Sequence, residues 1–154
     1  MRQKWLIAFC LTLGLLLPWQ ILAASTYEQT ASGDLIIHGR AITEKPTFIP
    51  LTVDGQKMEI IAVKDQHGLV RLAFNTCKVC NGSPKAYFKF ERGGFVCQNC
   101  DNFFPVAEVG ASRDGCNPLG IPSFELDAHK DIHIMAHVLR ANKNAFRNWK
   151  RGIE

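Results

Sequence analysis

Two Cys-x-x-Cys pairs constrain this chain more than any other feature. Cys77 and Cys80 form the first pair, Cys97 and Cys100 form the second, and sixteen residues separate the pairs. Two residues between cysteines allow the backbone to curl under one metal ion and present both sulfurs to it. Because this spacing is typical of a four-thiolate site, we predict that Cys77, Cys80, Cys97 and Cys100 are metal ligands.

The residues around the pairs favour the same interpretation. Asn81-Gly82 and Asp101-Asn102 follow the two pairs, and these residue types tolerate the positive φ of a tight turn. The segment between the pairs, AYFKFERGGFVC, predicts two short strands turned by Gly93-Gly94. A hairpin of this kind brings the two curls together, as in a zinc ribbon.

A fifth cysteine, Cys116, lies in the turn sequence Gly-Cys-Asn-Pro. We predict that it acts as a further ligand or as a gate for the site. Phe103 and Phe104 follow the second pair and predict a hydrophobic lid beside the sulfurs. An apolar shell excludes water from a thiolate site and tunes its potential.

Three histidines, His129, His133 and His137, stand four residues apart, a spacing that binds metal when it falls on one face of a helix. The β-branched content of residues 131–136 predicts a strand there instead. A strand spreads the three side chains apart, so we do not expect a histidine site.

The first 24 residues have the features of an export signal. Two basic residues precede an apolar run from Trp5 to Leu17, and Leu22-Ala23-Ala24 offers a cleavage site before Ser25. We expect cleavage; an uncleaved N-terminal anchor is the alternative, because Trp5 to Ala24 is long enough to span a membrane. Either way, residues 25–154 form a single domain in the periplasm or on the outer face of the cytoplasmic membrane.

The net charge argues against a nucleic-acid partner, and the number of cysteines argues against a pure disulfide framework. The net charge of +4 falls to +2 once Arg2 and Lys4 leave with the signal, which is too small to indicate a nucleic-acid partner. Five cysteines in an exported domain suggest disulfides. Their odd number and their spacing favour metal over a pure disulfide framework.

The rest of the chain predicts a small, mainly β fold of the α+β class. We expect strands at 34–42, 48–53, 57–63 and 69–74. Two tight turns join the last three of them into an antiparallel meander, which leads directly into the first cysteine pair. Asp54-Gly55 is a hairpin signal, and Pro50 favours an edge position for its strand.

The C-terminal part predicts two short strands and a helix. The strands are expected at 124–127 and 131–136, and the second echoes residues 34–39, which suggests similar edge positions for the two segments. An apolar stripe then recurs at intervals of three and four residues, which predicts an amphipathic helix with a basic face. The stripe consists of Leu139, Asn142, Phe146, Trp149 and Ile153.

Four motifs together resemble the FtrD-like membrane iron-sulfur protein family: VDGQKM from Val53, VRLAFNTCKVCNGS from Val70, VCQNC from Val96 and GCNP from Gly115. The resemblance covers roughly residues 33–146. It implies an iron-sulfur or other metal-binding domain outside the membrane, associated with ferrous-iron uptake, where a redox partner for the permease is the proposed role. The cofactor-binding residues of the family carry over to Cys77, Cys80, Cys97, Cys100 and Cys116.

Many members of that family carry this domain behind several membrane spans, whereas this chain has one N-terminal apolar segment. We therefore do not expect it to be a permease itself. The expected partners are a membrane iron permease or other iron-uptake components, with peripheral contact to anionic lipid through the basic helix face.

Three functions remain open from sequence. The first is an iron-sulfur or iron protein that transfers electrons or assists an iron transport system, and is not an enzyme. The second is a structural zinc ribbon within an accessory module. The third is a thiol-disulfide oxidoreductase. It is the least favoured, because no βαβ pattern surrounds either cysteine pair and neither pair precedes a helix. A chain exported unfolded must acquire its metal outside, which favours a simple ion over a preassembled cluster.

Overall fold

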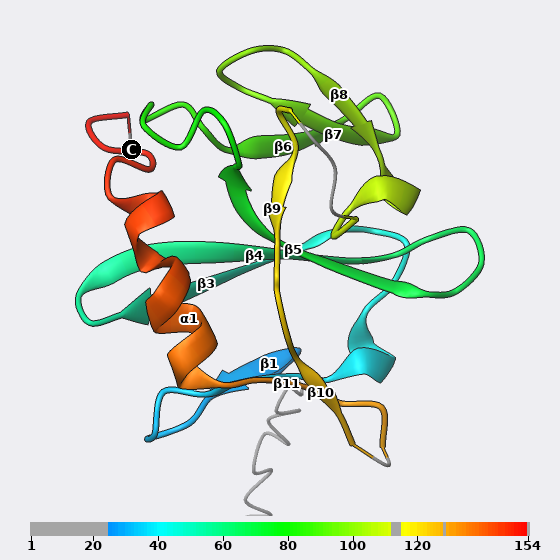
Figure 1. The fold of residues 1–154 in the computed structure, drawn as a ribbon. Helices are drawn as coiled ribbons and strands as arrows, with labels where there is room; N and C mark the ends of the chain where they lie inside the picture. The colour runs from blue at the N-terminus through cyan, green and yellow to red at the C-terminus, as the bar shows by residue number, and fades with distance from the viewer. Residues whose placement is uncertain (1–24, 112–114, 128, 154) are drawn as a thin grey trace, which may run out of the picture.

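The computed structural model describes residues 25–111, 115–127 and 129–153. These residues form three small antiparallel sheets, one short α-helix and three 3-10 turns (Figure 1). The predicted fold class, mainly β with a C-terminal helix, is confirmed. The predicted export signal at 1–24 lies outside the described residues.

The central sheet has the strand order β3-β4-β5-β9. Its members are β3 (Thr47–Val53), β4 (Gln56–Lys64), β5 (Val70–Cys77) and β9 (Pro118–Gly120). Asp54 and Gly55 adopt φ of 47° and 79° and form the predicted hairpin. Pro50 lies on an edge strand, as expected for a residue without a backbone donor.

β5 is longer than predicted at its carboxyl end. It continues three residues past the predicted end at Phe74, and Cys77 is its last residue. The pairing of β5 with β9 is irregular between Phe74 and Cys77. The first cysteine is therefore held by the central sheet itself and not by the loop that follows it.

The second sheet carries the second cysteine pair. It contains β6 (Phe88–Glu91), β7 (Gly94–Cys97) and β8 (Phe103–Pro105), followed by the 3-10 turn η2 (Val106–Glu108). The predicted hairpin is present, but its turn residues are Arg92 and Gly93, with φ of 56° and 76°. Gly94 instead opens β7 and allows β8 to approach, because a Cβ there would lie 2.5 Å from the Phe103 ring.

The third sheet joins the two ends of the domain. It has the order β1-β2-β11-β10, with β1 (Tyr27–Gln29), β2 (Leu35–Ile37), β11 (Ile132–Ile134) and β10 (Glu125–Leu126). The two segments that echo each other in sequence, β2 and β11, pair with one another as inner strands. Their predicted edge position is wrong.

β2 is shorter than the predicted strand at 34–42. It ends before the 3-10 turn η1 (Gly39–Ala41). Gly39 packs so closely on the carbonyl of Lys130 that a Cβ would come within 2.2 Å of that oxygen. The chain leaves the third sheet at this point, where only glycine fits beside the Lys130 carbonyl.

The predicted continuous C-terminal helix is wrong beyond residue 142. α1 (Ala136–Asn142) gives way to the 3-10 turn η3 (Lys143–Phe146), and further turns follow. The chain bends there because it hydrogen bonds to other elements: the indole N–H of Trp149 donates to Asn75 O (2.6 Å) and Lys150 N–H donates to Pro84 O (2.9 Å). Leu139, Phe146 and Trp149 of the predicted stripe are buried, whereas Ile153 is exposed.

The apolar side chains form two clusters. The larger one fills the space between the central sheet, the third sheet and the C-terminal helix. The smaller one lies between the central sheet and the second sheet and includes Cys77 and Cys97. Two of the cysteines are thus part of a hydrophobic core, where their sulfurs are removed from water.

Candidate metal centre

The first cysteine pair forms a closed turn after β5. The backbone N–H of Cys80 donates to Cys77 Sγ (3.4 Å), and Ser83 N–H donates to Cys80 O (2.8 Å). Asn81 and Gly82 do not adopt positive φ, so that part of the prediction is wrong. The Asn81 side chain instead donates to Lys78 O (3.1 Å) and closes the turn from outside.

The second pair repeats this arrangement after β7. Cys97 is the last residue of β7, and the backbone N–H groups of Asn99 and Cys100 act to lower the pKa of its thiol. Asp101 adopts φ of 58°, as predicted for the residue after the pair, and its N–H donates to Cys97 O (2.9 Å). Both pairs therefore begin at the end of a strand and curl around the first sulfur.

Asn75 positions the two pairs relative to each other. Its buried side chain accepts a hydrogen bond from Phe88 N–H (2.7 Å) and donates to Phe88 O (3.3 Å). Phe88 in turn lies opposite Cys97 in the β6–β7 register. Sequence reasoning missed Asn75; the one signal for it is a polar residue in an apolar strand, two positions before Cys77.

Cys116 lies between the two pairs, just before β9. Its sulfur is 2.9 Å from Cys77 Sγ, 3.7 Å from Cys80 Sγ and 2.8 Å from Cys100 Sγ. The neighbouring Asn117 O accepts a hydrogen bond from Lys78 N–H (2.9 Å), which fastens this segment to the first pair. The predicted fifth cysteine is therefore at the centre of the thiol cluster.

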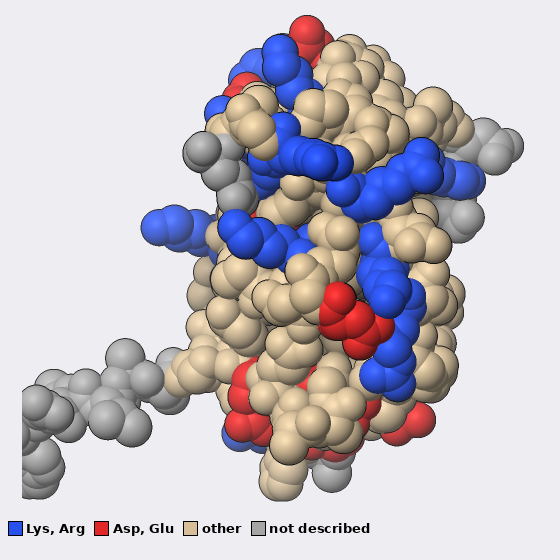
Figure 2. All heavy atoms as spheres, turned by 90° about the vertical axis from the view of Figure 1, so that its left-hand side faces the viewer, with Lys and Arg blue, Asp and Glu red and all other residues tan. Residues whose placement is uncertain are grey.

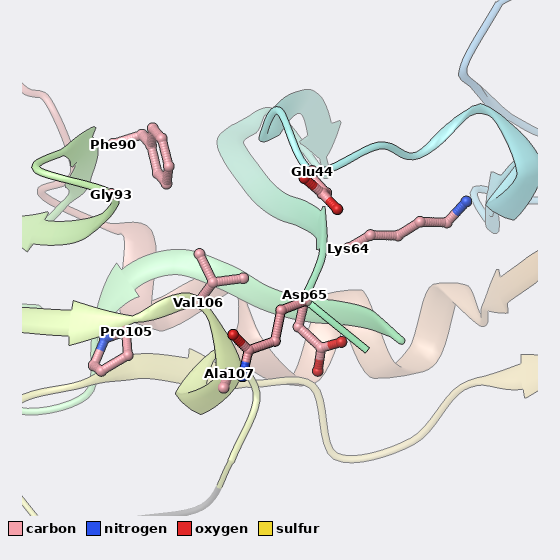
Figure 3. A pocket seen from close by; sticks show the side chains of 9 residues that line it. Glu44, Lys64, Asp65, Phe90, Gly93, Pro105, Val106 and Ala107 are labelled. Atoms are coloured by element: carbon pink, nitrogen blue, oxygen red, sulfur yellow. The ribbon is translucent and has the colours of Figure 1, made fainter. Parts of the chain in front are cut away.

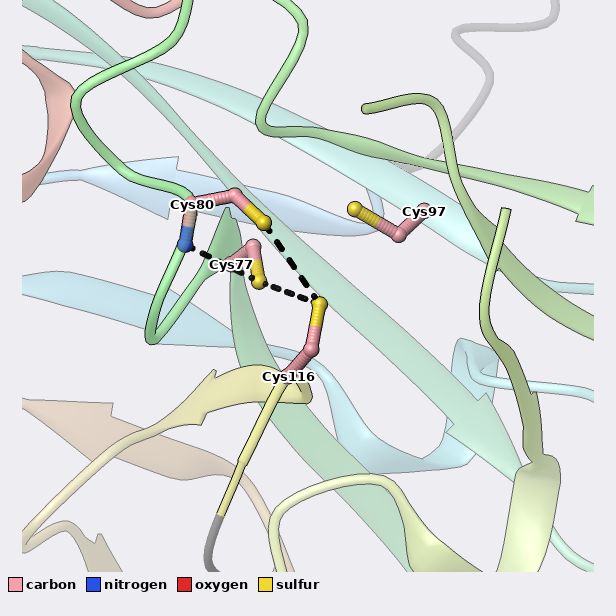
Figure 4. Close-up of side chains that lie close together, drawn as sticks. All are labelled: Cys77, Cys80, Cys97 and Cys116. Atoms are coloured by element: carbon pink, nitrogen blue, oxygen red, sulfur yellow. Dashed lines mark hydrogen bonds between the residues drawn. The ribbon is translucent and has the colours of Figure 1, made fainter. Parts of the chain in front are cut away.

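Four of the sulfurs form the tightest group. The sulfurs of Cys77, Cys80, Cys97 and Cys116 all lie within 4.8 Å of one another (Figure 4). Cys100 is not in this group; its side chain is exposed and reaches the cluster through Cys116. All five are free thiols. The three separations between Cys116 Sγ and the other sulfurs all exceed the S–S bond length of about 2.05 Å in a disulfide.

This donor set fits a metal held by sulfur. Zn–S bonds of about 2.3 Å place the corners of a tetrahedron about 3.8 Å apart. The 3.7 Å between Cys80 and Cys116 matches this edge, whereas the 2.9 Å between Cys77 and Cys116 is shorter, so those two sulfurs would have to move apart to bind one ion. Thiolates also hold the iron of iron-sulfur clusters, in sets of four. Because both zinc and iron accept four sulfur ligands, the donor set suits either metal.

The thiols of Cys97 and Cys116 hold their protons in the absence of metal. The hydrogen bond with Cys77, followed by burial, raises the pKa of the Cys97 thiol to about 12. Burial, together with the contact with Cys100, also raises the pKa of Cys116. A metal must displace these protons, so metal affinity increases with pH.

An apolar shell surrounds the buried sulfurs. Phe88 and Phe95 are fully buried in the same cluster as Cys77 and Cys97, and Phe104 packs edge-on against Phe88 with ring centroids 5.6 Å apart. Phe103 is 43% exposed and lies under the Arg92 guanidinium. The predicted two-residue lid is thus made by Phe104 alone.

The three histidines of the sequence pattern do not meet in one site. Within the ranges the structure describes, the cysteine cluster is the only group of three or more His, Cys, Asp or Glu side chains arranged to hold a metal. His133 lies on β11 and pairs with Asp127 (3.3 Å), whereas His137 lies on α1. The expectation that they spread apart is confirmed.

A surface hollow of about 420 Å³ lies between the end of β4 and the second sheet (Figure 3). Its polar wall includes Glu44, Lys64 and Asp65, and Phe90 lies on the opposite side. The Asp65 carboxylate is already paired with Arg71 (2.7 Å). The hollow includes none of the cysteines, and its most buried ionisable group is already satisfied.

A family model described as "Membrane iron-sulfur containing protein FtrD-like" matches residues 42–146, more than half of the chain. The chain belongs to this family. The match includes all five clustered cysteines, and it places this FtrD-like protein among metal-binding, iron-related proteins. Searches of curated proteins and of solved structures gave no match. In the described residues of this FtrD-like protein, no helix has the length and apolar character needed to cross a membrane.

Proposed function

We propose that this FtrD-like protein carries an iron-sulfur cluster or an iron ion outside the cytoplasm and serves an iron transport system by electron transfer or as an accessory component. The observation that carries the proposal is the group of four sulfurs within 4.8 Å of one another. Soft sulfur ligands select metals such as iron and zinc over the hard cations. The family description favours iron-sulfur.

The proposed ligands follow from the positions of the sulfurs. Cys77, Cys80 and Cys97 supply three of them, and Cys116 is the best placed fourth because it touches both pairs. Cys100, which the sequence pattern put in fourth place, becomes the exposed fifth thiol. The chain thus offers one sulfur more than a four-coordinate site requires.

An iron centre bound here would supply one-electron exchange, and the surrounding residues would control it. Cys77 and Cys97 are fully buried against apolar side chains, which keep water from that side. The N–H of Cys80 donates to the Cys77 sulfur, and hydrogen bonds to sulfur influence the reduction potential. Cys100 lies at the surface, so a redox partner can approach the centre from that side.

Location and partners follow the same reasoning. The apolar N-terminal segment supports export, with attachment to the outer face of the membrane if it is not cleaved. The partner is a membrane iron permease or another component of iron uptake, as the family association suggests. The net charge of +2 for residues 25–154 is too small to favour a nucleic-acid partner.

A structural zinc site is the second candidate. Four sulfurs within 4.8 Å of one another also suit zinc, and a structural metal helps to fold a small domain. A fifth, exposed thiol has no role in a closed structural site, which favours the redox proposal. A thiol-disulfide enzyme ranks last because both pairs lead into turns and not into a helix N-terminus.

Cys97→Ser tests the proposal. We expect the variant to lose nearly all bound metal and to unfold at a lower temperature than the native protein, because it removes a buried ligand. Val79→Ser is the matched control, since Val79 lies in the first turn but is 64% exposed. A Cys97→Ser protein with full metal content and unchanged melting would refute a site at these cysteines.

A further inference from the structure

We propose that a basic groove beside the first cysteine pair docks an acidic segment of a partner protein. The basic groove is the hollow of about 380 Å³ between the β3–β4 turn and the C-terminal segment, where Lys57, Arg147, Lys150 and Arg151 surround Trp149. The docked segment would belong to the redox or transport partner of the proposed function. The observations that support the basic groove do not depend on the proposed function.

Charge is the first of these observations. Four residues that line the basic groove are Lys or Arg, and no lining residue is acidic. Figure 2 shows Lys and Arg side chains gathered over this face, with most of the carboxylates toward its lower end. Like charges held around one hollow repel each other, and a bound anion relieves that repulsion.

The four cations differ in how they are held. Lys57, Arg147 and Arg151 are exposed at the rim. Lys150 is half-buried, and its ammonium lies 4.2 Å from the centre of the Trp149 ring and 3.6 Å from Glu59. Arg147 and Arg151 are therefore the residues best placed to meet a ligand, with Lys57 beside them at the rim, whereas Lys150 belongs to the floor.

The floor of the basic groove is bonded to the chain on both sides of the first cysteine pair. Before the pair, Trp149 donates to Asn75 O (2.6 Å); after it, Asn148 Nδ2 donates to Gly82 O and Lys150 N–H to Pro84 O (both 2.9 Å). Figure 1 shows the end of the chain beside these loops. A partner seated in the basic groove would therefore contact the segment that is bonded to both sides of the first cysteine pair.

The shape and chemistry of the basic groove favour a peptide over a lipid surface. The site is a hollow with an indole at its floor, which suits side chains that enter it better than a flat plane of headgroups. Arg147 and Arg151 present planar guanidinium groups that bind carboxylates through two parallel hydrogen bonds. We therefore assign the groove to a segment rich in Asp and Glu.

The test measures binding of a labelled poly-glutamate peptide to the metal-loaded protein at low and at physiological salt. The variant Lys57→Gln/Arg147→Gln/Arg151→Gln should bind at least about tenfold more weakly and lose most of the salt dependence. Lys150 is kept because it lies in the floor of the basic groove and pairs with Glu59. The control Arg40→Gln/Lys64→Gln/Lys130→Gln removes the same charge from a hollow near η1 and should bind as the native protein does.

Equal weakening in both variants would overturn the proposal, because net charge alone would then explain binding. Native affinity in the first variant would overturn it as well. Tighter binding to phosphatidylglycerol vesicles than to the peptide, lost in the first variant, would make lipid the occupant and would also overturn it. Metal content is measured in parallel: a protein that takes up no metal but still binds the peptide through the groove would refute the proposed function and leave the docking site standing.

Discussion

The indole N–H of Trp149 donates a hydrogen bond of 2.6 Å to the backbone carbonyl of Asn75, two residues before Cys77. The side chain of Asn75 forms two hydrogen bonds with the backbone of Phe88, which lies opposite Cys97. One buried asparagine therefore connects the C-terminal segment with both cysteine pairs. The C-terminal segment is part of the scaffold of the metal centre, although no ligand lies in it.

Trp149→Phe tests this connection. The variant retains an aromatic ring against Phe146 but leaves the Asn75 carbonyl without its donor, which should lower the free energy of unfolding by about 1–3 kcal/mol. Urea denaturation of the metal-free protein measures the change. Arg147→Gln, on the exposed side of the same segment, should stay within about 0.5 kcal/mol of the native protein. Equal stability of the two variants would show that the hydrogen bond is unimportant.

Cys116 and Cys100 compete for the position of fourth ligand, and two variants separate them. Cys116 belongs to the group of four sulfurs, whereas Cys100 is exposed. Cys116→Ser should therefore lower metal affinity at least about tenfold, and Cys100→Ser should retain metal close to the native level. Competition with a chelator measures both affinities. The reverse order would restore the ligand set expected from the two Cys-x-x-Cys pairs.

Gly94 controls how closely β8 approaches β7. A methyl group there would lie 2.5 Å from the Phe103 ring and 2.6 Å from Phe104 O, so Gly94→Ala must displace β8 and the lid residue Phe104. We expect a loss of about 1–3 kcal/mol in the free energy of unfolding. Gly82→Ala is the matched control, because nothing lies within 4 Å of its Cβ position. Similar thermal melting of the two variants would contradict the close packing of β7 and β8.

Arg71→Gln probes the buried Asp65 at low pH. Burial alone would raise the pKa of Asp65, but the hydrogen bonds from Arg71, Leu69 and His67 outweigh it and hold that pKa below its usual value of 3.8. A lowered pKa contributes stability above the usual value and loses it as pH falls. The variant should therefore unfold at a higher pH in acid titrations followed by circular dichroism. Arg40→Gln, which removes an exposed charge, should leave the midpoint in place.

Sequence patterns predicted the parts of the fold that depend on neighbours along the chain. Asp54-Gly55 predicted its hairpin, Pro50 predicted an edge strand, and the cysteine spacing predicted two matching curls. The pairing of β2 with β11 was not predicted, because it joins segments nearly one hundred residues apart. The end of the helix was not predicted either, since Trp149 and Lys150 bend the chain through contacts with distant backbone groups.

In the candidate site too, local sequence patterns predicted some features, and distant contacts determine the others. The five cysteines were found from spacing and family resemblance, because those signals are local. The central position of Cys116 depends on the pairing of β9 with β5, which no local pattern specifies. Asn75 was missed because a single polar residue in a strand has no distinctive spacing.

The most direct test of the central claim is metal analysis with a visible absorption spectrum, on protein purified without oxygen from an exporting host. We predict iron, with acid-labile sulfide if a cluster is present, and a sulfur-to-iron absorption band that bleaches on reduction. Cys97→Ser should abolish both the iron and the band. Zinc without a visible band, or oxidised thiols without metal, would contradict an electron-transfer role for this cysteine cluster.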